Sequence, residues 1–217
     1  TVFSEIGTAI TSVNVMEISE KFLKDSVQHN RQENTLTHDE LHATVEEFVT
    51  STSCPEILFN VDACLAMFWG TEIKLNQGSQ YISNPSWLSI GHSAPASIGH
   101  YLKNKKAPLI VTGDGGFQMV SQTYSTMVKL GVPALIIVMN NSVLGIEEYL
   151  LDPKSKRNEP LNYAKVSPWN YEAFPQIYNA DQSFGVKCTS TESLAKTLAD
   201  WAAYLNNGTD AKQPWIV

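Results

Sequence analysis

Two short polar turns hold the residues best suited to bind a metal ion and a phosphate group. The first is GDGG at 113–116, which follows the apolar run Leu109 to Val111, and the second is NN at 140–141, which follows Ala134 to Met139. Between them, Phe117 to Leu130 carries apolar residues at helical spacing. This order predicts strand, glycine turn, helix, strand and polar turn, a parallel βαβ unit. Both turns then lie at the carboxyl edge of the sheet, where open α/β folds bind ligands.

The chemistry expected of these turns is the binding of a phosphate through a divalent cation. Glycines let the backbone approach a ligand, and free N–H groups of the helix that begins near Phe117 favour an anion. Asp114 would repel that anion unless a cation lies between them. Mg²⁺ prefers oxygen ligands, which Asp114, Asn141 and the backbone carbonyl of Val143 can supply. Taken singly, a helix-capping Asp and a turn Asn are the better explanations of these residues, but together, at this spacing, the two residues favour metal binding.

The wider pattern resembles the metal–diphosphate motif of thiamine-diphosphate enzymes. The segments SWLSIGHSAPASIGH, GDGGFQ and MNNSVLGIEE occur in that order, and together they are similar to the pyruvate and indolepyruvate decarboxylase family. The resemblance covers roughly Thr35 to Val217. It implies an α/β fold with a doubly wound, mainly parallel sheet and helices on both faces. It also implies thiamine diphosphate and Mg²⁺ as cofactors, and a carbon–carbon lyase that decarboxylates 2-oxo acids.

The resemblance assigns roles to individual residues. Ile90 aligns with the bulky residue that supports the bent cofactor, and Leu88 stands where the family has a glycine whose carbonyl receives the aminopyrimidine amine. Glu147 aligns with the acidic residue that acts on the substrate carboxylate and on protons, and is the implied catalytic residue; an exposed glutamate at a helix start is the alternative. Asp114, Asn141 and Val143 are the implied metal ligands. The implied cofactor-binding residues are Leu88, Ser89, Ile90, Gly113, Asp114, Gly115, Gly116, Asn141, Val143, Leu144, Gly145 and Ile146.

Two departures from the family pattern weaken the expected cofactor contacts. DACLA at 62–66 stands where the family usually has an acid followed by Thr-Gly-Thr-Ser, so polar contacts to the cofactor are replaced by small or apolar side chains. Gly116 replaces a common serine. His38, His42, His92 and His100 are interpreted as surface or helix-packing residues, because none has a Cys, His or acid at metal-ligand spacing.

The predicted organisation is the tail of an upstream middle domain with its linker at 1–34, and a thiamine-diphosphate-binding domain at 35–217. In the family, a pyrimidine-binding domain of a partner subunit completes the site, so a homo-oligomer is expected and the isolated chain is expected to be inactive. The alternatives are a carboligase of the acetolactate synthase kind and a degenerate, non-catalytic assembly domain. NYEAFPQIYNA at 170–180 is similar to the decarboxylase branch.

The composition argues against some classes of binding partner. The net charge of −7, without a block of Lys or Arg, argues against nucleic acid and anionic membranes as partners. No apolar run has the length of a membrane span. The three cysteines have no metal-ligand spacing and their odd number argues against a disulfide framework, so a cytoplasmic setting is expected.

Local patterns outside the central unit predict the remaining elements. Capping-box patterns at Thr37/Glu40 and Thr189/Glu192 predict helices that end near Val49 and Leu205. The other predicted helices are 15–27, a short helix within 62–69, 89–102 and 170–178; the other predicted strands are 1–13, 56–61, 185–188 and 214–217; and 152–167 is predicted to be a loop.

Overall fold

The computed structural model describes residues 35–64, 66–151, 161–207 and 212–217. The elements predicted for 1–13 and 15–27, the linker at 28–34 and most of the predicted loop at 152–167 lie outside these ranges. The proposed domain boundary at residue 34 therefore stays a prediction. Within the described residues, no helix combines the length and the apolar character that a membrane span requires.

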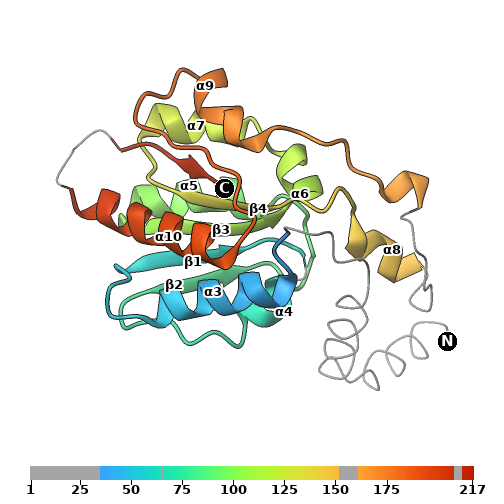
Figure 1. The fold of residues 1–217 in the computed structure, drawn as a ribbon, viewed down its shortest axis with the longest axis horizontal. Coiled ribbons are helices and arrows are strands. Elements are labelled where there is room, and N and C mark those ends of the chain that lie inside the picture. Colours follow the sequence, from blue (N-terminus) through green and yellow to red (C-terminus); the bar gives the residue numbers. More distant parts are fainter. Residues whose placement is uncertain (1–34, 65, 152–160, 208–211) are drawn as a thin grey trace.

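A five-stranded, all-parallel sheet forms the centre of the fold (Figure 1). The strands lie in the order β2-β1-β3-β4-β5. Their bounds are Ile57–Val61 (β1), Gln80–Ser83 (β2), Ala107–Gly113 (β3), Leu135–Met139 (β4) and Trp215–Ile216 (β5). The three central strands are buried almost throughout, as parallel strands are when helices cover both faces. The predicted doubly wound α/β fold is confirmed.

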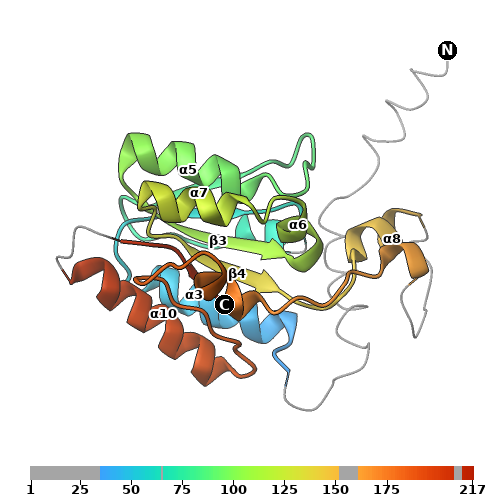
Figure 2. The same ribbon diagram turned by 90° about the horizontal axis from the view of Figure 1, so that it is seen from above.

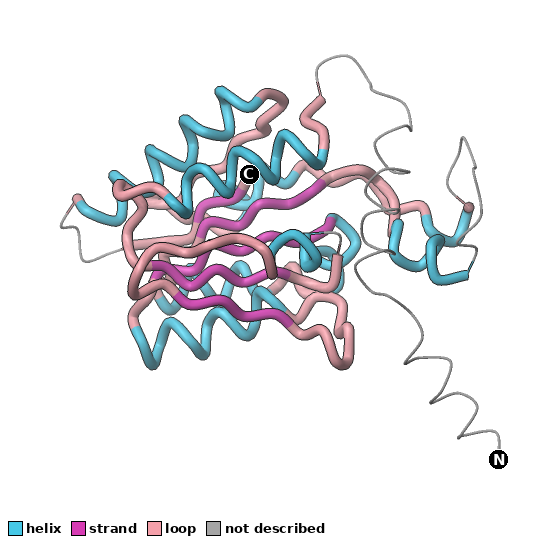
Figure 3. The backbone as a smooth tube through the Cα atoms, turned by 90° about the horizontal axis from the view of Figure 1, so that it is seen from below, coloured by secondary structure: helices cyan, strands magenta, loops and turns pink. Residues whose placement is uncertain are grey.

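Helices cover both faces of the sheet (Figures 2 and 3). On one face, α3 (His38–Thr50), α4 (Ala66–Gly70) and α10 (Thr191–Asn206) pack on alternate strand side chains such as Leu109 and Val111. On the other, α5 (Ser93–Asn104), α6 (Asp114–Met119) and α7 (Thr123–Leu130) pack on the side chains between them, such as Ile110. The period of two along each strand thus divides the core into two layers. The smaller elements are α8 (Gly145–Leu151), α9 (Phe174–Ile177) and the 3₁₀ turns η1 (Asn162–Ala164) and η2 (Tyr171–Ala173).

The helix predicted over 117–130 is two helices, which corrects the prediction. Helix α6 begins earlier, at Asp114, and the backbone of Val120 leaves the helical region before α7 begins at Thr123. Both helices contact the same cluster of aromatic residues. Phe117 of α6 packs against the rings of Tyr171 and Phe174, at centroid distances of 5.9 and 5.3 Å. Tyr124 of α7 packs against Phe174 at 5.6 Å. Helix α7 also packs against α5.

Four other predictions are wrong in detail. The helix predicted from Ser89 begins at Ser93, because Leu88 and Gly91 have φ angles of 50° and 83°, outside the helical region. The segment 185–188 is no strand, since only an isolated bridge joins Gly185 to Ile216.

The predicted second capping box is displaced by one residue, to Ser190 and Ser193. The segment predicted as a helix at 170–178 is a 3₁₀ turn followed by the single turn α9. Strand β2 was not predicted because Gln80–Ser83 is a half-exposed edge strand without a run of buried apolar residues.

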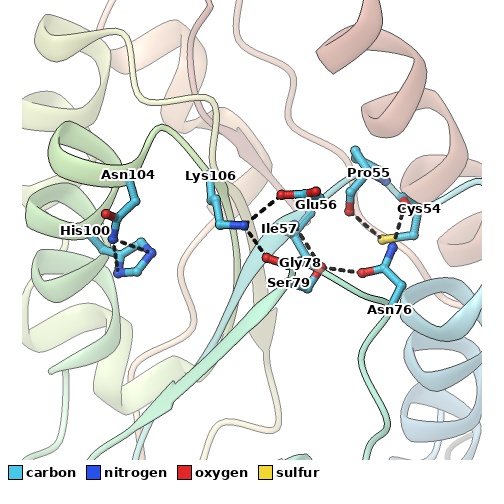
Figure 4. A network of polar contacts seen from close by, with 10 residues as sticks. All are labelled: Cys54, Pro55, Glu56, Ile57, Asn76, Gly78, Ser79, His100, Asn104 and Lys106. Atoms are coloured by element: carbon cyan, nitrogen blue, oxygen red, sulfur yellow. Dashed lines mark hydrogen bonds and ion pairs between the residues drawn. The ribbon is translucent and has the colours of Figure 1, made fainter.

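A network of hydrogen bonds connects the amino ends of the strands, at the edge opposite the predicted ligand edge (Figure 4). Lys106 donates to the Glu56 carboxylate at 2.8 Å and to the carbonyl of Gly78. Ser79 Oγ accepts from the Ile57 amide at 3.0 Å and donates to Asn76, whose amide group donates to the Cys54 carbonyl at 2.7 Å. These bonds hold the turn before β2 against β1 and β3.

Gly78 is the position in this network where a side chain is least tolerable. Its φ angle is +92°, and an added Cβ would overlap the Glu56 carboxyl group. We expect Gly78→Ala to lower the free energy of unfolding by about 1–3 kcal/mol, measured by urea denaturation. Gly99→Ala is the matched control, because Gly99 is an exposed helical glycine with no atom near an added Cβ. The control should be neutral or stabilising by up to about 1 kcal/mol. Equal effects of the two substitutions would contradict this explanation.

Candidate functional site

The strand order creates a crevice between the carboxyl ends of β1 and β3. The loop after β1 leads toward β2 on one side, and the loop after β3 leads toward β4 on the other side. The two loops therefore diverge at the carboxyl ends of the neighbouring strands β1 and β3. Open α/β sheets bind ligands at such a switch point. A cavity lies there. Its lining residues are His38, Asp62, Ala63, Cys64, Ile90, Gly113, Asp114, Gly115, Gly116, Met139, Asn141, Val143, Leu144, Gly145 and Ile146.

The register of β3 and β4 brings the two predicted turns together. Gly113 pairs with Met139 at the carboxyl end of the ladder, so Asp114 and Asn141 leave the sheet on neighbouring strands. Asp114 is 1% exposed. Its carboxylate accepts from the backbone amide of Gly115 at 2.7 Å and from that of Ser142 at 2.6 Å. The acidic turn after β3 is therefore hydrogen-bonded directly to the turn after β4.

Burial raises the pKa of Asp114, and the amides of Gly115 and Ser142 oppose this rise only in part. The ionised carboxylate is thus less well solvated than it would be in water. A divalent cation beside it would favour the ionised form.

The backbone around Val143 leaves its carbonyl available. Leu144 donates to the Ala164 carbonyl at 2.7 Å and Ser142 accepts from the Val166 amide at 3.0 Å, which together form an isolated antiparallel bridge. In such a bridge the residue between the bonded pair directs its own N–H and C=O to the opposite side. The N–H of Val143 donates to Asn141 Oδ1 at 3.2 Å, which leaves that amide oxygen a second lone pair.

The two glycines after Asp114 allow close packing. A Cβ on Gly115 would lie 2.9 Å from Cγ of Leu144, so Leu144 packs directly on the backbone there. A Cβ on Gly116 would lie 3.1 Å from Thr112 Oγ1 and 3.5 Å from Ile90 Cγ2. A side chain at Gly115 would push α8 and its leading loop away from Asp114.

Asp62, which follows β1, organises the other side of the crevice. It is 3% exposed. Its carboxylate accepts from the Gly91 amide at 2.9 Å and from the hydroxyls of Ser93 and Thr112, each at 3.0 Å. The amide of Ala63 also donates to it, at 2.8 Å. Asp62 thereby joins β1, β3 and the turn before α5, and it fixes Ile90 in the cavity wall.

The structure places most, but not all, of the predicted site residues in this cavity. Leu88, Ser89 and Glu147 do not line it, and their roles stay predictions. Leu88 is partly exposed with φ of +50°, a conformation suited to the glycine that the resemblance expects there. Glu147 lies half-buried in the first turn of α8, next to the lining residue Ile146.

Sequence reasoning did not name five of the lining residues as site residues, Ala63 of the divergent segment among them. Asp62 was quoted only as part of a divergent segment, although an acid at the end of a wholly apolar strand was a usable signal. Cys64 and Met139 carried no signal of their own. His38 was interpreted as a surface or helix-packing residue, whereas the structure places it in the cavity wall.

Comparisons with known proteins show the family of the chain and support its fold. Residues 63–210 match the family model described as "Thiamine pyrophosphate enzyme, C-terminal TPP binding domain". The chain belongs to this family. Thiamine diphosphate is the cofactor of these enzymes, and Mg²⁺ is its usual partner ion.

Curated relatives and a solved structure are similar to most of the chain. It is 29% identical over 181 residues to a pyruvate decarboxylase of Neurospora crassa, which covers 82% of the chain and 30% of that protein. It is 26% identical over 156 residues to an alpha-keto-acid decarboxylase of Mycobacterium bovis, covering 71% of the chain and 27% of that protein.

The structure of benzoylformate decarboxylase from Polynucleobacter necessarius matches with a TM-score of 0.64 and 16% identity, over 87% of the chain and 34% of that protein, and supports the fold. The chain thus spans about a third of the length of the relatives that it matches.

The donor set of the cavity is compatible with a Mg²⁺–diphosphate group. Among the described residues, no cluster of three or more His, Cys, Asp or Glu could hold a metal ion. A cation here would therefore be bound by one carboxylate, an amide oxygen, a carbonyl, phosphate oxygens and water. Mg²⁺ is usually held in this way, whereas Zn²⁺ prefers nitrogen and sulfur ligands.

The structural role of Asp62 can be tested by stability measurements without the cofactor. In Asp62→Asn one carboxylate oxygen becomes an NH₂ group that faces donors from the Gly91 turn, Ser93 or Thr112. We expect the free energy of unfolding to fall by about 1–3 kcal/mol, because a buried donor loses its acceptor. Urea denaturation measures this. Asp200→Asn, in an exposed pair with Lys196, is the control and should change stability by less than about 1 kcal/mol. An Asp62→Asn protein as stable as the wild type would refute the bridging role.

Proposed function

We propose that the chain is the diphosphate-binding part of a thiamine-diphosphate-dependent enzyme that decarboxylates 2-oxo acids of the pyruvate or indolepyruvate type. The observation that carries this proposal is the cavity at the β1/β3 switch point, in which the buried Asp114 is hydrogen-bonded to the turn that carries Asn141 and Val143. The decarboxylase names of the curated relatives support the reaction class.

In this proposal each residue has a defined task. Asp114, Asn141 and the Val143 carbonyl hold Mg²⁺, which neutralises the diphosphate. Ile90, fixed by Asp62 through the neighbouring Gly91 amide, supports the cofactor from the side of α5. Glu147 acts on the substrate carboxylate and moves protons. When bound, the cofactor supplies a nucleophilic carbon and an electron sink for breaking the bond to the carboxyl group.

The site needs parts from outside these residues. We propose that a pyrimidine-binding domain of a partner subunit completes it in a cytoplasmic homo-oligomer. The partial coverage of the relatives supports this, because their whole length is about three times that of the match.

A non-catalytic assembly domain is the second candidate function. The observation that favours it is the apolar side chain of Ala63 in the cavity wall, where the resemblance expects a polar residue. A titration of the complete protein with thiamine diphosphate and Mg²⁺ separates the two candidates, because an assembly domain would give no binding heat. A carboligase would instead convert two molecules of pyruvate to acetolactate and one carbon dioxide, so the aldehyde is the product that distinguishes a decarboxylase from it.

Asp114→Ala in the complete protein tests the metal site. We expect Mg²⁺-dependent binding of thiamine diphosphate to weaken by more than about 100-fold in isothermal titration, since even outer-shell partners of metal ligands change affinity by 10- to 100-fold. Asp181→Ala, at an exposed loop position away from the cavity, should bind as the wild type does. Unchanged Mg²⁺-dependent binding by Asp114→Ala would remove the basis of the site assignment.

The isolated chain of residues 1–217 should not decarboxylate 2-oxo acids, because the half of the site that would contact the aminopyrimidine is proposed to lie in another domain. Release of carbon dioxide from pyruvate or indolepyruvate by the purified chain measures this, with the complete protein as positive control. Turnover by the isolated chain would show that these residues are sufficient.

A further inference from the structure

A histidine that has no role in the proposed metal site lies in the cavity wall. His38 is the first residue of α3, and α3 runs antiparallel to β1, so the helix begins at the carboxyl edge of the sheet (Figures 1 and 2). A capping box fixes this start. The Glu40 amide donates to Thr37 Oγ1 at 3.2 Å, and the Thr37 amide donates to the Glu40 carboxylate at 2.9 Å. The position of His38 is therefore set by the helix itself.

The imidazole of His38 has hydrogen-bonding capacity that the described residues do not use. Its Nδ1 atom is buried and has no hydrogen-bond partner among them. Burial lowers the pKa of His38, against the opposing effect of Asp39, so the ring is neutral at neutral pH. A buried polar nitrogen without a partner costs free energy, and native proteins seldom leave one unpaired.

The other side chains on the β1 side of the cavity have little capacity to form hydrogen bonds to a ligand. The Asp62 carboxylate is already engaged with the Ala63 and Gly91 amides and the hydroxyls of Ser93 and Thr112. Cys64 is an uncharged thiol, because burial raises its pKa to about 12, and a thiol is a weak donor. Of the lining side chains on this side, His38 is the one that can still form a strong hydrogen bond to a ligand.

We infer that His38 hydrogen-bonds a polar atom of bound thiamine diphosphate from the β1 side, where the side chains of Ala63 and Cys64 offer no strong hydrogen bond. The inference rests on the proposed function. A neutral imidazole donates through one nitrogen and accepts through the other, so it can bond a phosphate oxygen or an aminopyrimidine group. His38 thus replaces part of the polar contact to the cofactor that the divergent segment DACLA does not provide.

Three variants of the complete protein test this: His38→Leu, His38→Gln and, as matched control one turn along the same helix, His42→Leu. Isothermal titration with thiamine diphosphate at saturating Mg²⁺ gives the affinity, and urea denaturation without cofactor gives the stability. We expect His38→Leu to bind about tenfold more weakly or worse. The cofactor-free protein should be as stable as the wild type or more stable, because the unpaired nitrogen is gone. His38→Gln should retain most of the affinity, and His42→Leu should bind as the wild type does.

The outcomes separate this inference from the proposed function. Wild-type affinity in His38→Leu, with binding abolished in Asp114→Ala, would overturn the role of His38 alone. A wild-type protein that binds no thiamine diphosphate would overturn both. Reduced stability with unchanged affinity would assign His38 a packing role instead. Should His38→Leu not fold, the imidazole ¹⁵N resonance of His38 in the wild type, assigned with His38→Gln, must shift on cofactor binding, and an unshifted resonance would count against the contact.

Discussion

Two carboxylates are buried at the carboxyl ends of neighbouring parallel strands, and the loops of the site are arranged around them. A buried charge is costly unless hydrogen bonds or an opposite charge compensate it. Asp62 receives four donors, two amides and two hydroxyls, and is compensated by the protein itself. Asp114 receives the amides of Gly115 and Ser142, yet its pKa is still raised by burial. The first carboxylate therefore holds the structure together, whereas the second keeps an incompletely compensated charge, as expected for the proposed cation site.

This difference bears on whether the domain is catalytic or degenerate. A domain kept only for assembly gains no stability from an incompletely compensated carboxylate at Asp114. Such a domain likewise gains no stability from the backbone of Ser142, whose φ angle is +58° and whose amide donates to that carboxylate. Strained or poorly compensated groups that cluster in a cleft are typical of functional sites. Ala63 and Cys64 stand in one wall of the cavity where the resemblance expects polar side chains, whereas Asp114 and Asn141, the proposed metal ligands, stand in the other wall.

The sequence predicted the central unit because each of its signals is local. Buried strands, the GDGG and NN turns and their separation specify a parallel βαβ unit, and the sheet edge follows from strand direction. Asp114, Asn141 and Val143 were placed correctly in one cavity for that reason. Contacts between elements far apart in the chain were beyond such reasoning. Asp62 meets Gly91, Ser93 and Thr112 only after folding, and nothing local in the polar pattern of Gln80–Ser83 indicates an edge strand.

His38 shows most clearly where a pattern-based argument stops. The absence of a nearby Cys, His or acid at metal spacing was a sound reason to reject it as a metal ligand, and the structure gives no cause to revise that. Rejection as a ligand of a metal does not exclude contact with an organic cofactor, because such a contact needs one polar atom in the right place and no sequence spacing. That place is set by the direction of α3 relative to β1 and by the capping box at Thr37. A helix that packs antiparallel to a strand at a switch point always brings its first turn to the ligand edge. In this fold, the first residues of such helices therefore have to be considered as site residues even when their sequence carries no motif.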